Sequence, residues 1–143
     1  MDEHAARQAF EHAIGDYQQD FGSFFLLRLM DLKVAYPDDT CTITFPVRDF
    51  LFNPQGTLHG GVSATVLDIA MGHLMRHTYG SPGTTLEMKT QYFRGVAAGG
   101  EAKAEARILR RGREICFLEA RLFDQEDRLA IMATSTWKLM KKS

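Results

Sequence analysis

The residues best suited to chemistry lie in one stretch, NPQGTLHGGVSATVLDIAMG, which covers residues 53–72. It holds a single carboxylate, Asp68, among apolar residues of a predicted helix. Because burying an ionised carboxylate without partners is very costly, Asp68 must face water, a polar partner or a cleft. Two interpretations carry equal weight. Asp68 hydrogen-bonds a backbone amide or a neighbouring arginine, or it acts as a general base or nucleophile.

Gly60 and Gly61 begin the same predicted helix. Backbone N–H groups at a helix start have no partner inside the helix and lie at the positive end of its dipole. They could stabilise an oxygen that gains negative charge in a reaction, although glycine also occurs at plain helix starts. Asn53, on the preceding loop, could supply another amide donor or only hold the loop, and loop-holding is the commoner role.

The spacing of these features limits how they could cooperate. Asp68 follows Gly60 by eight residues, a rise of about 12 Å in a helix. Donor and base must each lie within about 3 Å of the reacting atoms. A shared active site therefore needs the carboxylate of a second subunit, with two such helices antiparallel across a two-fold axis.

Other reactive side chains form weaker patterns. Ser63 lacks the closing glycine and preceding strand of a nucleophile elbow, so it is interpreted as an early-helix hydroxyl. His73 and His77 are spaced as metal ligands on a helix can be, but without a recognisable third ligand an exposed helix face is preferred. We therefore predict no metal site.

Three arginines surround Gly112 in a predicted hairpin: Arg110, Arg111 and Arg113. A solvated turn is the simplest interpretation, although an arginine there, or Arg94, could bind phosphate groups. Cys41 and Cys116 lie in apolar alternating segments without a second ligand nearby, which indicates reduced, partly buried thiols.

Helical periodicity predicts an amphipathic helix over residues 3–20, closed near Gly22, and a buried central helix over residues 60–79. Strand patterns follow the first helix and the central helix, in six segments: 24–36, 40–47, 84–94, 101–111, 113–124 and 128–140. The sequence therefore predicts an α+β fold, with about six antiparallel strands around one long helix, in a single domain covering residues 1–143.

Composition excludes some partners. With 17 basic and 18 acidic side chains and a net charge of −1, the chain has no general attraction for nucleic acid or anionic membrane. The start, MDEHAARQAF, lacks the basic and apolar parts of a secretory signal, and no apolar stretch is long enough to span a bilayer. We expect a cytoplasmic protein.

The opening stretch contains a set of residues with a recognisable order and spacing: Asn53, Gly56, His59, Gly60, Gly61 and Asp68. This set resembles the signature of hot-dog fold acyl-coenzyme A thioesterases, in the phenylacetate-pathway group that includes the mammalian thioesterase superfamily members. The similarity extends from about residue 24 to residue 138. One departure is Gly95, where relatives often carry a proline.

The resemblance implies a hot-dog fold and a role for several residues. The Gly60 N–H polarises the thioester carbonyl with Asn53 nearby, and His59 lies near the departing thiolate. The aspartate matching Asp68, from the neighbouring subunit, activates water or attacks directly. A hydroxyl on the following strand orients water, for which Thr85 is the choice and Thr84 the fallback.

The leading hypothesis is therefore a thioesterase for an acyl- or aryl-acyl-CoA. Its substrate would contact Gly61, Arg94 and Arg111, and coenzyme A, as part of the substrate, is the only cofactor expected. Active sites at a homodimer interface, and a tetramer formed as a dimer of dimers, are implied. Two alternatives remain open, a hot-dog hydratase or dehydratase and a non-catalytic acyl-CoA-binding module.

Overall fold

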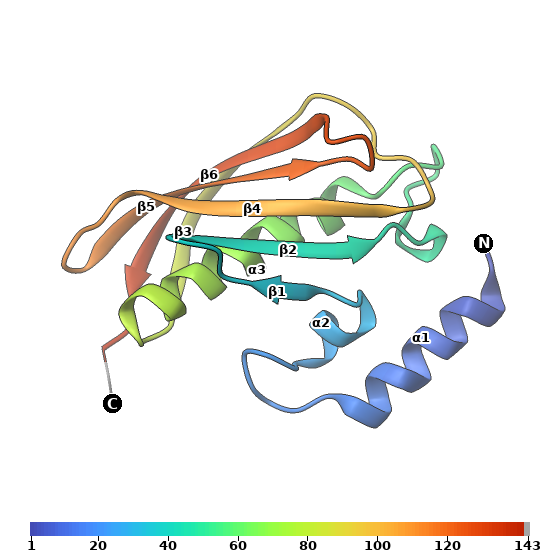
Figure 1. The fold of residues 1–143 in the computed structure, drawn as a ribbon, viewed down its shortest axis with the longest axis horizontal. Coiled ribbons are helices and arrows are strands. Elements are labelled where there is room, and N and C mark those ends of the chain that lie inside the picture. Colours follow the sequence, from blue (N-terminus) through green and yellow to red (C-terminus); the bar gives the residue numbers. More distant parts are fainter. Residues whose placement is uncertain (142–143) are drawn as a thin grey trace.

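A computed structural model describes residues 1–141 and shows a curved sheet folded over one long helix (Figure 1). The helix is α3 (Gly60–Tyr79). The six antiparallel strands lie in the order β1-β2-β4-β5-β6-β3. Their bounds are β1 Lys33–Ala35, β2 Thr40–Pro46, β3 Gly83–Tyr92, β4 Glu101–Arg110, β5 Ile115–Phe123 and β6 Leu129–Leu139. The predicted α+β hot-dog architecture is confirmed.

The core lies between α3 and the concave face of the sheet. Side chains of α3 at Val66, Leu67, Ala70 and Met71 are fully buried. The strands opposite them present many small residues to the helix: Ala102, Ala104, Ala106, Ala120, Ala130 and Ala133. Small side chains let a helix approach a sheet closely, which explains why a helix that is apolar nearly all round packs here.

The prediction of one strand over residues 24–36 is wrong for the first half of this segment. It forms a short helix, α2 (Phe25–Leu29), and only its end forms strand β1. Asp31, with a φ of 53°, separates the two. A short apolar run does not distinguish a buried helical turn from a strand by periodicity alone, and here packing of Leu27 and Met30 into the core favours the helix.

The N-terminal helix, α1 (Glu3–Asp16), ends earlier than the predicted residue 20. Asp2 caps its start by accepting a hydrogen bond from the Ala5 N–H at 3.0 Å. The helix packs on α2 rather than on the sheet, with the Phe10 and Phe25 rings edge to face at 5.5 Å. It therefore lies beside the sheet's β1 edge (Figure 1).

Strand β3 forms the other edge of the sheet and pairs only with β6. Its outer edge consequently leaves backbone N–H and C=O groups without a strand partner. Leu86, Tyr92 and Phe93, in or next to this strand, are 54%, 53% and 53% exposed. An edge with free backbone groups and exposed apolar side chains is a surface on which another strand can pair.

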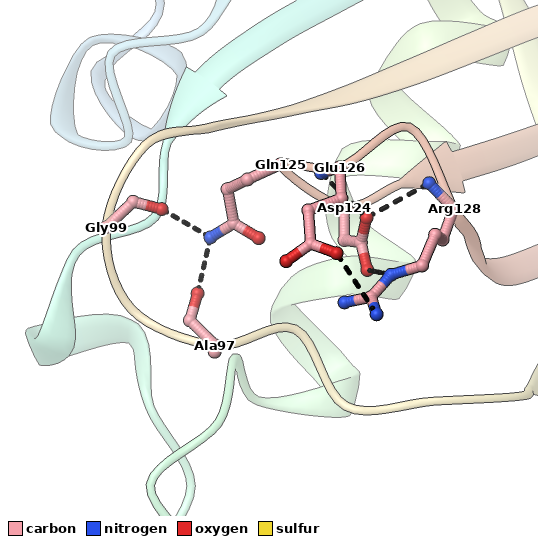
Figure 2. A network of polar contacts seen from close by, with 6 residues as sticks. All are labelled: Ala97, Gly99, Asp124, Gln125, Glu126 and Arg128. Atoms are coloured by element: carbon pink, nitrogen blue, oxygen red, sulfur yellow. Dashed lines mark hydrogen bonds and ion pairs between the residues drawn. The ribbon is translucent and has the colours of Figure 1, made fainter.

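A polar network joins two loops at one end of the sheet (Figure 2). The buried carboxylate of Asp124 accepts hydrogen bonds from the Glu126 and Arg128 N–H groups, and it holds the Arg128 guanidinium at 2.9 Å. Gln125 Nε2 donates to the carbonyls of Ala97 and Gly99. The β5–β6 turn thereby fixes the loop that follows β3.

Both cysteines are free and fully buried among residues 1–141. Burial raises the pKa of the Cys41 thiol to about 12, so this side chain stays a neutral thiol at physiological pH. No helix in the described part of the chain combines the length and the apolarity required to cross a membrane.

Close packing of α3 on Trp137 gives a stability test. A Cβ added at Gly72 would lie 3.2 Å from Trp137 Cη2, whereas one at Gly15, in α1, would meet nothing within 4 Å. We expect Gly72→Val to lower the free energy of unfolding by about 1–3 kcal/mol through overpacking. Gly15→Val is the matched helical control and should change it by less than about 0.5 kcal/mol. Urea titration measures both, and equal effects would contradict this packing.

Candidate active site

His59 organises the start of α3. Its Nδ1 accepts a hydrogen bond from the Gly61 N–H at 2.9 Å, and its backbone carbonyl accepts one from the Ser63 N–H at 3.0 Å. Because Nδ1 accepts, the proton of the neutral ring lies on Nε2, which is free to donate. His59 therefore caps the helix and offers one N–H donor beside it. Gly61, by contrast, has already committed its own N–H to the cap.

The Gly60 N–H is an unpaired donor at this helix start. No group within residues 1–141 accepts a hydrogen bond from it. Tyr92, at the end of β3, donates its hydroxyl proton to the Gly60 carbonyl at 2.9 Å, and its ring lies 3.1 Å from where a Gly60 Cβ would be. A side chain at position 60 would crowd the Tyr92 ring, which would have to shift by a few tenths of an ångström.

Asn53 holds the loop before the helix. Its Oδ1 accepts hydrogen bonds from the Gln55 and Thr57 N–H groups at 3.0 and 3.1 Å, and its Nδ2 donates to the Thr57 hydroxyl at 3.0 Å. Gly56 adopts a φ of 80° in the same turn. Most hydrogen bonds of the Asn53 side chain therefore hold the loop. One Nδ2 proton stays available for another acceptor.

Gly95 packs directly against this loop. A Cβ at residue 95 would lie 3.0 Å from Thr57 Cγ2. The neighbouring Val96 carbonyl accepts a hydrogen bond from the Leu58 N–H at 2.9 Å. The small size of Gly95 therefore leaves space for Thr57, which in turn bonds Asn53. The network in Figure 2 anchors the other end of the same loop.

One cavity, of about 290 Å³, lies at this helix start. Residues from the loop, the helix and the end of β3 line it, including Asn53, Gly60, Tyr92 and Arg94. It thus combines an unpaired backbone N–H, an amide and a guanidinium. These groups suit a polarised carbonyl oxygen with a nearby anionic group.

Asp68 lies in a different cavity. Its Oδ1 accepts a hydrogen bond from the Thr85 hydroxyl of β3 at 2.7 Å. The ion pairs found in residues 1–141 do not include Asp68. Among residues 1–141, Asp68 therefore bonds a hydroxyl, and not the arginine or backbone amide that the structural interpretation expected. Thr84, the fallback, donates instead to Met140 Sδ at 3.0 Å and lines another cavity.

This second cavity, of about 380 Å³, is mainly apolar. Helix α3, strand β6 and the segment before α2 line it with Asp68, Ile69, Trp137, Phe21 and Phe24. The two cavities share no lining residue. One chain thus places the unpaired Gly60 N–H and the Asp68 carboxylate in separate cavities.

Arg111 is remote from both cavities. It lies after β4, 3.9 Å from the Asp39 carboxylate, and its charge acts on Tyr79 at the C-terminal end of α3. Arg94 therefore shares a cavity with Gly60 in this chain, whereas Arg111 lies by the opposite end of the helix.

We predicted that both α3 histidines lie on an exposed face, and this is wrong for His73. Its side chain is only 5% exposed, because the segment around Phe21 covers it. His77 is exposed and stacks on Tyr36 with ring centroids 4.1 Å apart. Residues 1–141 hold no group of three or more potential metal-ligating side chains. Ser63 is buried and donates to the His59 carbonyl at 3.3 Å, as an early-helix hydroxyl does.

Sequence reasoning missed two residues of these cavities, Tyr92 and Trp137, and placed a third, His73, on an exposed face. Each belongs to an element that was expected, but strand register and helix rotation decide what a side chain faces. The bulge between Thr85 and Glu87 in β3 shifts this register. Tyr92 is the last residue of β3. Its place two residues before Arg94, a predicted phosphate-binding residue, could have indicated that it belongs to the site.

Loss of the His59 cap should weaken α3. We expect His59→Ala to lower the free energy of unfolding by about 1 kcal/mol, since the Gly61 N–H loses its acceptor. His59→Asp supplies another acceptor and should recover most of that loss. His12→Ala, an exposed histidine of α1, is the control. Thermal and urea unfolding report the difference, and a His59→Ala variant as stable as the control would contradict the capping role.

Comparisons with known proteins identify the family of this chain. The family model described as Thioesterase superfamily matches residues 55–131. Acyl-coenzyme A thioesterase 13 of Mus musculus is 38% identical over 66 residues, which cover 46% of this chain and 47% of that protein. The chain thus spans about half the length of the curated relatives it matches.

Solved structures extend the likeness to nearly the whole chain. A conserved protein of Pseudomonas aeruginosa is 27% identical with a TM-score of 0.76, over 85% of this chain and 98% of that one. A Bacillus halodurans protein, crystallised with CoA, is 21% identical with a TM-score of 0.88, over 99% and 95%. The latter likeness concerns the fold. On the family match and this shared architecture, the chain belongs to the thioesterase superfamily.

Proposed function

We propose that the protein hydrolyses an acyl- or aryl-acyl-CoA to the free acid and CoA. The observation that carries the proposal is the Asp68 carboxylate, which faces a cavity with a hydroxyl as its only hydrogen-bond partner among residues 1–141. An unpaired backbone N–H at the start of the same helix provides the complementary donor. The family match and the CoA bound by the Bacillus halodurans structure support this substrate class.

In the proposed reaction, the Gly60 N–H binds the thioester oxygen as negative charge develops on it. The free Nδ2 proton of Asn53 can add a second hydrogen bond to the same oxygen. Asp68 removes a proton from water as general base, or attacks the carbonyl itself to form an anhydride that water then hydrolyses. The Thr85 hydroxyl orients the carboxylate and the water.

His59 serves the leaving group in this scheme. Its Nε2 proton lies next to the helix start, because Nδ1 is bound to the Gly61 N–H. An N–H donor there stabilises the departing thiolate. The sulfur leaves with the electron pair of the C–S bond and is finally protonated to the free thiol of CoA.

The two halves of the site must come from two subunits. Gly60 and Asp68 lie eight residues apart on one straight helix and line separate cavities. We infer a homodimer in which two β3 strands pair along their free edges and the two α3 helices run antiparallel. Each Gly60 would then face the Asp68 of the other chain. A tetramer formed from two such dimers, and a cytoplasmic location, stay predictions.

The antiparallel arrangement also gives the remote arginine a possible role. It would bring the C-terminal end of one α3 toward the N-terminal end of the other, and with it the hairpin that carries Arg111. Arg94 of one chain and Arg111 of the other could then both approach the phosphates of CoA. No cofactor other than the CoA of the substrate is proposed.

Two alternatives make different predictions. A hydratase or dehydratase on this fold would hydrate an enoyl thioester without releasing thiol. An acyl-CoA-binding module would bind tightly with no turnover. An assay of free thiol beside an assay of enoyl absorbance separates the three functions.

Replacing Asp68 tests the catalytic assignment. Asp68→Asn keeps the size of the side chain and an acceptor for Thr85 but removes the base, so thiol release across an acyl-CoA panel should fall a hundredfold or more. Asp127→Asn, an exposed turn residue with a φ of 58°, is the matched control and should retain full activity. Wild-type turnover by Asp68→Asn would rule out this role.

A further inference from the structure

Tyr92 makes a hydrogen bond that the backbone of α3 does not require. Its hydroxyl donates to the Gly60 carbonyl at 2.9 Å. Gly60 is the first residue of α3, and a carbonyl there accepts from the N–H four residues further along the helix. The Tyr92 side chain is 53% exposed, so its hydroxyl can bond water instead. The need to pair buried polar groups therefore does not explain this bond.

The sheet fixes Tyr92 at this place. Tyr92 ends β3 and pairs with Ile131 of β6. The following N–H, that of Phe93, donates to the Ala130 carbonyl at 2.8 Å. The Tyr92 ring lies against Gly60, and both residues line the cavity of about 290 Å³ at the helix start. Because the backbone is held on both sides, the hydroxyl is directed at the helix start before any substrate arrives.

The bonded carbonyl connects Tyr92 to His59. The Gly60 carbonyl and the Gly61 N–H belong to one planar peptide group. The carbonyl accepts from the Tyr92 hydroxyl, and the N–H donates to His59 Nδ1 at 2.9 Å. Because Nδ1 accepts, the proton of the neutral ring lies on Nε2. The donors therefore point in one direction, from the Tyr92 hydroxyl through the peptide group to the His59 Nε2–H.

A chain of this kind strengthens its last donor. A hydrogen bond to a peptide oxygen draws electron density from the N–H of the same group, because the group is conjugated. The imidazole ring passes polarisation from Nδ1 to Nε2 in the same way. Cooperative strengthening in such chains is about 10–30% per bond. The gain matters most where the last donor meets a charge, and in the proposed reaction that charge is the departing thiolate.

We propose that Tyr92 is a positioning residue for thiol departure, acting on the sulfur through the Gly60–Gly61 peptide group and His59. As the C–S bond breaks, its electron pair leaves on the sulfur, where the hydrogen bond from Nε2 stabilises it. A proton from solvent then completes the free thiol. The inference rests on the proposed thioesterase function and assigns Tyr92 to one step of it.

Two thioesters of the same acyl group test this role. The CoA thioester releases a strongly basic alkanethiolate, whereas the 4-nitrophenyl thioester releases a weakly basic arenethiolate that needs little stabilisation. Tyr92→Phe keeps the ring and removes the hydroxyl. We expect it to lower kcat/KM for the CoA thioester about fivefold, the value of one ordinary hydrogen bond, and for the nitrophenyl thioester by less than about twofold. Tyr17→Phe, at an exposed tyrosine after α1, is the matched control and should change neither value.

The outcomes distinguish the inference from the function beneath it. Equal losses for the two thioesters would show that Tyr92 only steadies the helix start, since the Gly60 N–H serves both alike. Equal losses, or no loss for either, would therefore overturn the inference and leave the thioesterase function intact. Absence of thiol release from every acyl-CoA by the wild-type protein would overturn the proposed function.

A double variant tests whether Tyr92 acts through His59. In the His59→Ala background the chain is already broken, so Tyr92→Phe should cost less than about twofold in kcat/KM for the CoA thioester. Losses that multiply would show that the Tyr92 hydroxyl acts independently of His59, which contradicts the inference. Thermal unfolding of each variant checks that the fold is kept.

NMR of the free protein tests the hydrogen bonds without turnover. Spectra of ¹H and ¹⁵N in alkaline buffer, where free imidazole is neutral, report the Gly61 amide proton and the His59 tautomer. We expect Tyr92→Phe to move the Gly61 amide proton upfield, because its bond to Nδ1 weakens, and Tyr17→Phe to leave it in place. An unchanged Gly61 resonance in Tyr92→Phe would overturn the inference even in an active enzyme. The expected shift in a protein that hydrolyses no acyl-CoA would retain the hydrogen-bond chain and refute the thioesterase function.

Discussion

The pitch of α3 holds the two reactive features of the chain apart. Asp68 follows Gly60 by eight residues on α3, so the helix separates them by about 12 Å. The donor at the helix start and the carboxylate therefore open into different cavities. In the proposed mechanism, a single thioester therefore meets both kinds of group where two chains come together.

The rest of the fold serves these two positions. The β5–β6 turn holds the loop after β3, which packs on Thr57 and so steadies Asn53 beside the helix start. Strand β3 contributes at three levels. It supplies Thr85 to the carboxylate, Tyr92 to the Gly60 carbonyl, and a free edge on which a second subunit can pair. In the proposed mechanism, chemistry and assembly therefore depend on the same strand.

Much of this followed from the sequence where local signals were strong. The central helix, the alternating strands and the exceptional position of Asp68 reflect periodicity and the cost of burying charge. The helical turn within residues 24–36 was not predicted, because a short apolar run fits a helical turn as well as a strand. The burial of His73 depends on how a distant segment near Phe21 covers α3, and no local pattern encodes that contact.

Complementation between subunits tests the central claim most directly. Gly60→Val places a branched side chain next to the donor and against Tyr92, and Asp68→Ala removes the carboxylate, so each homodimer should lose activity. In a heterodimer of the two variants, purified through two different tags, one interface site combines an intact Gly60 with an intact Asp68. We predict about half the wild-type activity, because one of two equivalent sites is restored. A heterodimer as inactive as either homodimer would contradict an active site shared between subunits.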